Sequence, residues 1–486
     1  MPETTPASVK RVLSYASESI FIVALVMVTL LVFIGTFVRV NRLSNVAQYL
    51  PSETEAFVVM NAEDYLSSVG VIPSVFNDIL GESIANYDWF KRDIALAWVD
   101  GELLQFLEVN SKAQAETFLE SLMVEGETML DHQDYKCYEV TQPNCYAFRG
   151  SFLILGSSDA LESLDSGLEA NSNYQNVRHR LPYNTSLFAY VNAQEVRQDF
   201  LISLGELSIW EPGYLESVLR IFPAYGLAVK MENDEWTSES FVPVDKSLLD
   251  GEAFFHPEVK FYGNLLAYAP EDLQFEWTGT ELHSQLSAML SHLDTLNSAA
   301  GIVLNADLQS QWSKYFGNAD LDEFGPILNQ EQVIAWTPNE SFIWMLEIQE
   351  EDRDLALSLK DFFLATYNEG QNLEATKEEY NRDSYIEIKE NGAPKYFLAV
   401  LEDLAIASNN SDYFFESLDR WNGRSDLRDI DQMNPVLLGA DQAIRLDMTI
   451  FPESHIINLL LPGIKTWISS TKTFDDGIYN RSILQF

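Results

Sequence analysis

Basic residues are scarce in this chain of 486 residues. Thirty lysines and arginines stand against 74 aspartates and glutamates, which gives a formal net charge of −44 at pH 7. A chain of this charge repels phosphate backbones, because nucleic acid binding needs positive surface. The composition therefore argues against a nucleic acid partner. It leaves open whether the acidity serves cation binding, a saline habitat or solubility alone.

Signatures of catalysis are also missing. The six histidines form no HExxH pair, and the chain has no GxSxG, P-loop or GxGxxG motif. These absences remove the common patterns of metalloproteases, of α/β-hydrolases and of nucleotide binding. We predict no catalytic residue and no cofactor from these patterns, although a dispersed triad would leave no sequence motif.

One acidic segment resembles a calcium-binding loop. Asp320, Asp322, Gly325 and Glu331 fall at positions 1, 3, 6 and 12 of an EF-hand-type spacing. Position 5 is Phe324, however, and an apolar side chain there removes an oxygen ligand. We therefore predict an ordinary acidic loop and no metal site.

Cysteine is almost absent. Cys137 and Cys145 flank the segment YEVTQPN, in which Thr141-Gln142-Pro143-Asn144 is typical of a turn. A hairpin would bring the two thiols together as a disulfide, while a pair of buried free thiols is the alternative.

Long apolar runs are limited to one. Residues 19–38 read SIFIVALVMVTLLVFIGTFV without a charge, and a helix of this length spans about 30 Å, the thickness of the bilayer core. The run is longer than the apolar region of a cleaved signal peptide. We predict a transmembrane signal-anchor helix at 19–38.

The charges beside this run do not decide its orientation, because Lys10 and Arg11 precede it while Arg39 and Arg42 follow it. Long domains translocate with little regard to charge. The expected topology is a cytoplasmic tail at 1–18, a linker at 39–49 and the bulk of the chain extracytoplasmic. The protein would then be a single-pass protein of the plasma membrane.

A strand–hairpin–helix unit follows the linker. Ile94–Val99 and Leu103–Val109 are apolar runs joined by Asp100-Gly101, a strong hairpin signal. Ser111 then stands three residues before Gln114, in the spacing of a capping box, which predicts a helix.

The same order recurs in the second half of the chain. Val333–Trp336 and Phe342–Ile348 are apolar runs around a turn, and an apolar stripe follows at helical spacing. Trp98 and Trp336 occupy matching places. The predicted fold class is α+β: a transmembrane helix followed by two related antiparallel sheet-plus-helix halves, 50–245 and 255–486, with a cleft between them. Two unrelated α+β meanders are the alternative.

Four features together carry a resemblance: the apolar run at 19–38, the opening LPSETEAFVVMNAEDYL at 50–66, the strand–hairpin–helix unit and FLILGSSDALESLD at 152–165. They resemble an uncharacterised bacterial envelope family, a domain of unknown function with a transmembrane anchor and duplicated α+β units. The resemblance implies a place in the cell envelope and brings no catalytic position with it.

From these observations we expect a non-enzymatic, membrane-anchored extracytoplasmic protein that binds an envelope partner, assembles with copies of itself or acts as a scaffold. Its contact with the membrane would be residues 19–38. The alternatives are a carrier of an apolar ligand and an envelope enzyme with a dispersed active site. A carrier should show a large apolar cavity between sheet and helices, and an enzyme should show convergent polar groups in a cleft. A scaffold should show neither of these and instead an exposed apolar patch.

Two tryptophans beside acidic residues, Trp210 and Trp236, could line a binding surface, although core packing is the simpler interpretation.

Overall fold

A computed structural model describes residues 43, 45–64, 88–122, 127–138, 145–195, 220–232, 235–248, 261–296, 298–317, 319–337, 339, 341–368, 373–430, 433–450 and 464–485. The predicted tail at 1–18 and the predicted membrane helix at 19–38 lie outside these residues.

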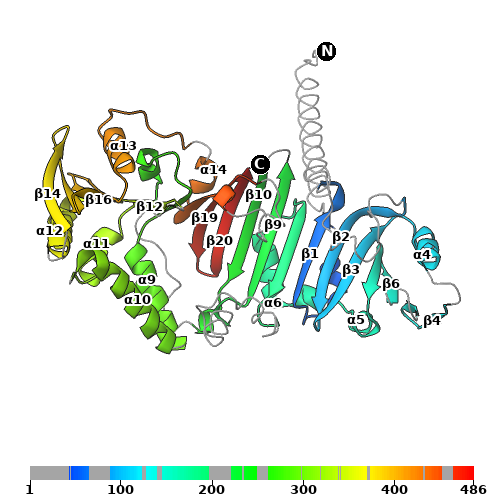
Figure 1. Ribbon diagram of the computed structural model, residues 1–486. Coiled ribbons are helices and arrows are strands. Elements are labelled where there is room, and N and C mark those ends of the chain that lie inside the picture. The colour runs from blue at the N-terminus through cyan, green and yellow to red at the C-terminus, as the bar shows by residue number, and fades with distance from the viewer. Residues whose placement is uncertain are drawn as a thin grey trace, which may run out of the picture.

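Within the described residues, twenty strands pair into one antiparallel sheet (Figure 1). From one edge to the other the strands are β4 (Met129–Asp131), β5 (Lys136–Tyr138), β6 (Cys145–Arg149), β7 (Phe152–Gly156), β3 (Glu102–Val109), β2 (Phe90–Val99), β1 (Ala56–Asn61), β8 (Leu187–Asn192), β9 (Ala224–Glu232), β10 (Glu235–Pro243), β20 (Gly477–Gln485), β19 (Thr466–Phe474), β18 (Gln442–Asp447), β11 (Phe275–Gly279), β12 (Gln332–Trp336), β13 (Phe342–Glu347), β17 (Leu404–Ser408), β16 (Ala393–Val400), β15 (Asp383–Glu390) and β14 (Leu373–Tyr380).

The predicted fold class, with two separate sheet-plus-helix halves behind a membrane helix, is wrong. β10 pairs with β20 from Glu235 opposite Gln485 to Pro243 opposite Gly477, so strands from both parts of the chain form one sheet. Each of these strands satisfies the backbone groups that the other would leave open at an edge. What was expected to be a boundary between halves is a continuous ladder.

The strand order on the two sides of this central pair corresponds. Moving outward from β10 the order is β9, β8, β1, β2, β3 and β7, and from β20 it is β19, β18, β11, β12, β13 and β17. Trp98 near the end of β2 and Trp336 at the end of β12 therefore occupy corresponding strands. The internal repeat and its boundaries at 50–245 and 255–486 stay a prediction.

The local units predicted from sequence are confirmed. Asp100 and Gly101 have φ angles of 52° and 75°, the left-handed conformation that a two-residue turn between twisted strands requires. The helix α4 (Lys112–Ser121) begins after Ser111, whose hydroxyl accepts a hydrogen bond from the backbone N–H of Gln114 at 3.4 Å.

Helices cover both faces of the sheet. Besides α4, the described α-helices are α5 (Ser158–Glu162), α6 (Ser172–Arg180), α9 (Leu282–Leu296), α10 (Ser298–Phe316), α11 (Gly325–Leu328), α12 (Arg353–Asn368), α13 (Ser411–Trp421) and α14 (Asn434–Leu437). The short 3₁₀ helices are η1 (Val46–Tyr49), η3 (Leu168–Ala170), η4 (Lys246–Leu248), η5 (Asn264–Tyr268), η6 (Asp322–Phe324), η7 (Glu350–Asp352) and η8 (Met448–Ile450).

The predicted localisation, a single-pass plasma-membrane protein with its bulk extracytoplasmic, needs correction. In the part of the chain that the structure describes, no helix has both the length and the apolar character needed to cross a membrane.

Around β12 and β13 the sheet has helices on both sides, with α13 on one side and α9 and α10 on the other (Figure 1). Val333 and Ile343 belong to the same core cluster as Phe414 of α13. Leu346, whose side chain points to the opposite face, clusters instead with Phe316 of α10. This division follows from the alternation of side chains along a strand, and it creates the layer that holds the candidate site.

Cys137 and Cys145 lie directly opposite each other on β5 and β6, and the structure joins them as a disulfide. Replacing both residues with serine is expected to lower the free energy of unfolding by about 2–3 kcal/mol, because the bond closes a short loop in the unfolded chain. Urea unfolding of the oxidised protein and of the double variant measures the difference, and reduced wild-type protein should behave like the variant. Alkylation of both thiols in denatured, unreduced protein would contradict the bond.

Candidate functional site

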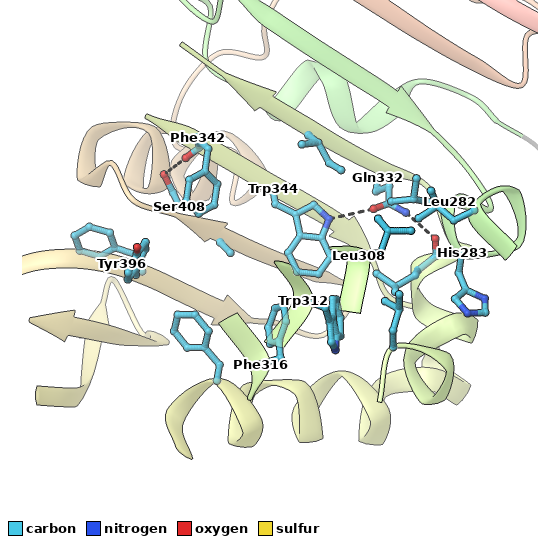
Figure 2. A pocket seen from close by; sticks show the side chains of 17 residues that line it. Leu282, His283, Leu308, Trp312, Phe316, Gln332, Phe342, Trp344, Tyr396 and Ser408 are labelled. Carbon is cyan, nitrogen blue, oxygen red and sulfur yellow. Dashed lines mark hydrogen bonds between the residues drawn. The ribbon is translucent and has the colours of Figure 1, made fainter. Parts of the chain in front are cut away.

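A cavity of about 360 Å³ lies between the sheet and the helices α9 to α12 (Figure 2). Its lining is predominantly apolar and rich in aromatic rings. The residues that line it are Leu282, His283, Leu286, Leu308, Trp312, Phe316, Leu321, Leu328, Gln332, Ile334, Phe342, Trp344, Phe363, Tyr396, Phe397, Ala407 and Ser408.

The floor of the cavity is formed by neighbouring strands. Ile334 of β12 lies opposite Trp344 of β13, and Trp344 lies opposite Ala407 of β17. Residues opposite each other in an antiparallel sheet point to the same face. The small side chain of Ala407 beside the large ring of Trp344 leaves room at this point of the sheet.

The helix α10 supplies the roof. Leu308, Trp312 and Phe316 are spaced by four residues, so they lie along one face of the helix. Figure 2 shows Trp312 and Phe316 rising from this helix toward the strands. The ring centroids of Phe316 and Trp344 are 6.2 Å apart in an edge-on arrangement, so helix and sheet touch here.

The polar atoms at the floor are already hydrogen-bonded to protein. Trp344 Nε1 donates to Gln332 Oε1 at 3.1 Å, and Gln332 Nε2 donates to the carbonyl of Leu328 at 2.6 Å. The Ser408 hydroxyl donates to the carbonyl of Phe342 at 2.6 Å (Figure 2). Because these donors are satisfied, a bound molecule would meet mainly hydrocarbon surface.

Two further polar side chains of the lining, those of Trp312 and His283, also contact polar groups of the protein. Trp312 Nε1 donates to the carbonyl of Ala319 at 3.0 Å. His283 lies 2.9 Å through Nε2 from Asp322 Oδ1, and the Asp322 side chain is 77% exposed. This pair therefore marks a solvent-facing part of the wall.

The calcium-like residues are not brought together as ligands. Glu331 is buried and accepts the backbone N–H groups of Tyr262 and Leu265 at 3.1 and 2.9 Å, while Asp322 contacts His283. Among the described residues, no group of three or more histidine, cysteine, aspartate or glutamate side chains could hold a metal ion.

The cavity does not lie in the predicted cleft between two halves. It lies wholly among residues 282–408, within the second part of the chain. Trp236 is 1% exposed and therefore cannot line a surface. Trp210 lies outside the described residues.

Sequence reasoning missed the residues of the cavity. The four-residue spacing of Leu308, Trp312 and Phe316 was a readable signal of an apolar helix face. Such a spacing does not tell a fully packed face from one that borders a cavity, since both need the same residue types.

Taken together, the geometry is that of an apolar pocket in a layer of sheet and helices. No family model matches the chain, and no curated protein matches it. The resemblance to an uncharacterised envelope family thus stays a prediction.

Solved structures with a weak likeness are crystal forms I, III and IV of TP0453, at 9%, 10% and 10% sequence identity. They cover 44%, 45% and 44% of this chain and 81%, 90% and 90% of their own, with TM-scores of 0.25, 0.26 and 0.23. At such scores we draw nothing from the likeness about fold or function.

Proposed function

We propose that this protein binds a small, uncharged apolar molecule in the pocket between α10 and the strands β12, β13 and β17. The observation that carries the proposal is the cavity of about 360 Å³ itself, lined by Leu308, Trp312, Phe316 and Trp344. Its volume falls within the range of small-molecule sites, roughly 300–1,000 Å³.

The chemistry of the wall supports the apolar character of the ligand. Each methylene moved from water into such a wall contributes about 0.8 kcal/mol. The hydrogen bonds of Gln332 and Ser408 to backbone carbonyls leave little to recognise a charge. An enzyme would need convergent, available polar groups at this place, so binding is favoured over catalysis. Binding to a protein partner or to a second copy of the chain stays a prediction.

The proposal is tested with a substitution that fills the cavity. Ala407 lines it and is 9% exposed, so Ala407→Trp places a large ring where the ligand would lie. The probe is N-phenyl-1-naphthylamine, an uncharged dye that fluoresces more strongly in apolar surroundings. We expect wild-type protein to bind it with a dissociation constant in the micromolar to sub-millimolar range, from roughly 0.3–0.5 kcal/mol per non-hydrogen atom. We expect the variant to bind it at least tenfold more weakly.

The matched control is Ala393→Trp, which adds the same side chain at an exposed position of β16. This variant should bind the probe like wild type. A second cavity variant, Ala407→Leu, keeps the test valid if the larger ring prevents folding, as judged by circular dichroism. Unchanged probe binding in folded Ala407 variants, or no binding by wild type, would overturn the proposal.

A further inference from the structure

A second cavity, of about 660 Å³, lies in the part of the sheet beyond the β10–β20 pair from the first cavity. There α6 and η1 meet β1, β2 and β8. Arg178, Lys91 and Arg92 line it together with the rings of Phe57 and Phe188. We infer that this cavity binds a small amphiphilic anion. Its carboxylate or phosphate group would pair with the guanidinium of Arg178, and its apolar part would lie against Phe57 and Phe188.

The guanidinium of Arg178 is held in place by the protein. Nη1 donates to the carbonyl of Pro182 at 3.1 Å and lies 3.5 Å from that of Leu181. The central carbon of the group is 3.7 Å from the ring centroid of Tyr183 and 4.7 Å from that of Phe188. Stacking and carbonyl contacts together orient a planar fork that matches the two oxygens of a carboxylate or phosphate.

Among the residues that the structure describes, no acid matches the charge of Arg178. Among the carboxylates that the structure describes, none lies within ion-pairing distance of it, whereas Arg180, two residues further on, has Nε 3.0 Å from Asp476 Oδ2. The chain carries 74 acidic residues, so an acidic partner would have been readily available. Burial lowers the pKa of Arg178 below its ordinary value, because it removes water from around the charged group. A bound anion would remove that cost.

The acids that share the cavity are engaged elsewhere. Glu108 is paired with Lys91 at 2.6 Å, and Glu169 accepts a hydrogen bond from the side-chain amide of Asn45. They therefore compete little with a ligand for Arg178. Phe57, Val46 and Val59 add apolar wall beside the cation, which is why an anion with a hydrocarbon part fits better than a bare ion.

The experiment uses the full chain and measures binding by calorimetry at constant ionic strength. The probes are octanoate, octyl phosphate, inorganic phosphate and octanol. We expect octanoate or octyl phosphate to bind at least tenfold more tightly than octanol and inorganic phosphate, and the comparison of the first two tells which oxyanion is preferred. All titrations are repeated in Ala407→Trp protein, so that binding in the first pocket is separated from binding here.

Arg178→Gln should weaken anion binding at least tenfold. Arg178→Lys keeps the charge but loses the fork of the guanidinium. Its affinity for the anion should lie between that of wild type and that of Arg178→Gln. The matched control is Arg382→Gln, because Arg382 is exposed in the turn between β14 and β15, and this variant should bind like wild type. Hydrogen exchange of unmutated protein should show protection of α6 when the anion is present. Anion binding that folded Arg178 variants leave unchanged, binding without protection of α6, or no binding by wild type would overturn the inference.

Discussion

Replacing Glu276 with glutamine is expected to lower the free energy of unfolding by about 3–5 kcal/mol. Glu276 is 1% exposed, and it accepts hydrogen bonds from Arg428 at 2.6 and 3.0 Å and from Arg445 at 2.6 Å. The glutamine side chain has nearly the same shape but no charge, so two largely buried guanidinium groups would lose their counter-ion. Urea unfolding followed by circular dichroism measures the change.

The matched control is Glu390→Gln. Glu390 pairs with Lys395 at 2.8 Å, but the side chains of both residues are more than one third exposed. An exposed pair of this kind contributes about 0–1 kcal/mol, because water and salt screen it. A loss at Glu276 no larger than the loss at Glu390 would contradict the assigned role of the buried cluster.

Replacing Trp236 with alanine is expected to cost a similar amount, about 3–5 kcal/mol, because it leaves a large void in a packed core. Trp236 is among the largest fully buried side chains and lies on β10, directly opposite Leu484 of β20. It therefore packs on the ladder that merges the two parts of the sheet. The free energy of unfolding in urea is again the measurement.

A partly exposed tryptophan in the same row serves as the control. Trp467 of β19 lies opposite Leu484 on its other side and is 37% exposed. Trp467→Ala removes the same atoms from a position that water already reaches, so a loss of about 1–2 kcal/mol is expected. Equal losses at Trp236 and Trp467 would show that the central ladder is not the packed core described above.

Variants at Glu276 and Trp236 separate the stability of the sheet from binding at the two proposed sites. The apolar pocket is built on β12, β13 and β17, and the cavity of Arg178 on β1, β2 and β8, on opposite sides of the β10–β20 pair. Variants at Glu276 or Trp236 that remain folded should therefore change stability without abolishing binding at either site.

Local structure was predictable because it depends on neighbours in the chain. The turn at Asp100-Gly101 needs residues that tolerate a positive φ, and the start of α4 needs a hydroxyl three residues before Gln114. Both requirements are visible in a few consecutive residues, and the structure meets both.

The pairing of distant strands was not predictable in this way. β10 (EWTSESFVP) and β20 (GIYNRSILQ) both mix apolar and polar residues, and neither sequence identifies the other strand as its partner. A prediction of two separate halves treats each group of strands as complete. The structure instead joins them, because the open backbone groups of one strand are satisfied by the other.

What the sequence by itself determined is the acidic charge, the absence of motif-based catalysis and the local units of strand, turn and helix. Only the tertiary structure decided that the strands form one sheet and that Trp344, Trp312 and Ala407 line one cavity. It alone also placed Arg178 beside Phe188, with no acidic partner among the described residues. The physical reason is that propensity and periodicity act over a few residues, whereas a cavity or an unmatched charge depends on which side chains several distant elements bring together.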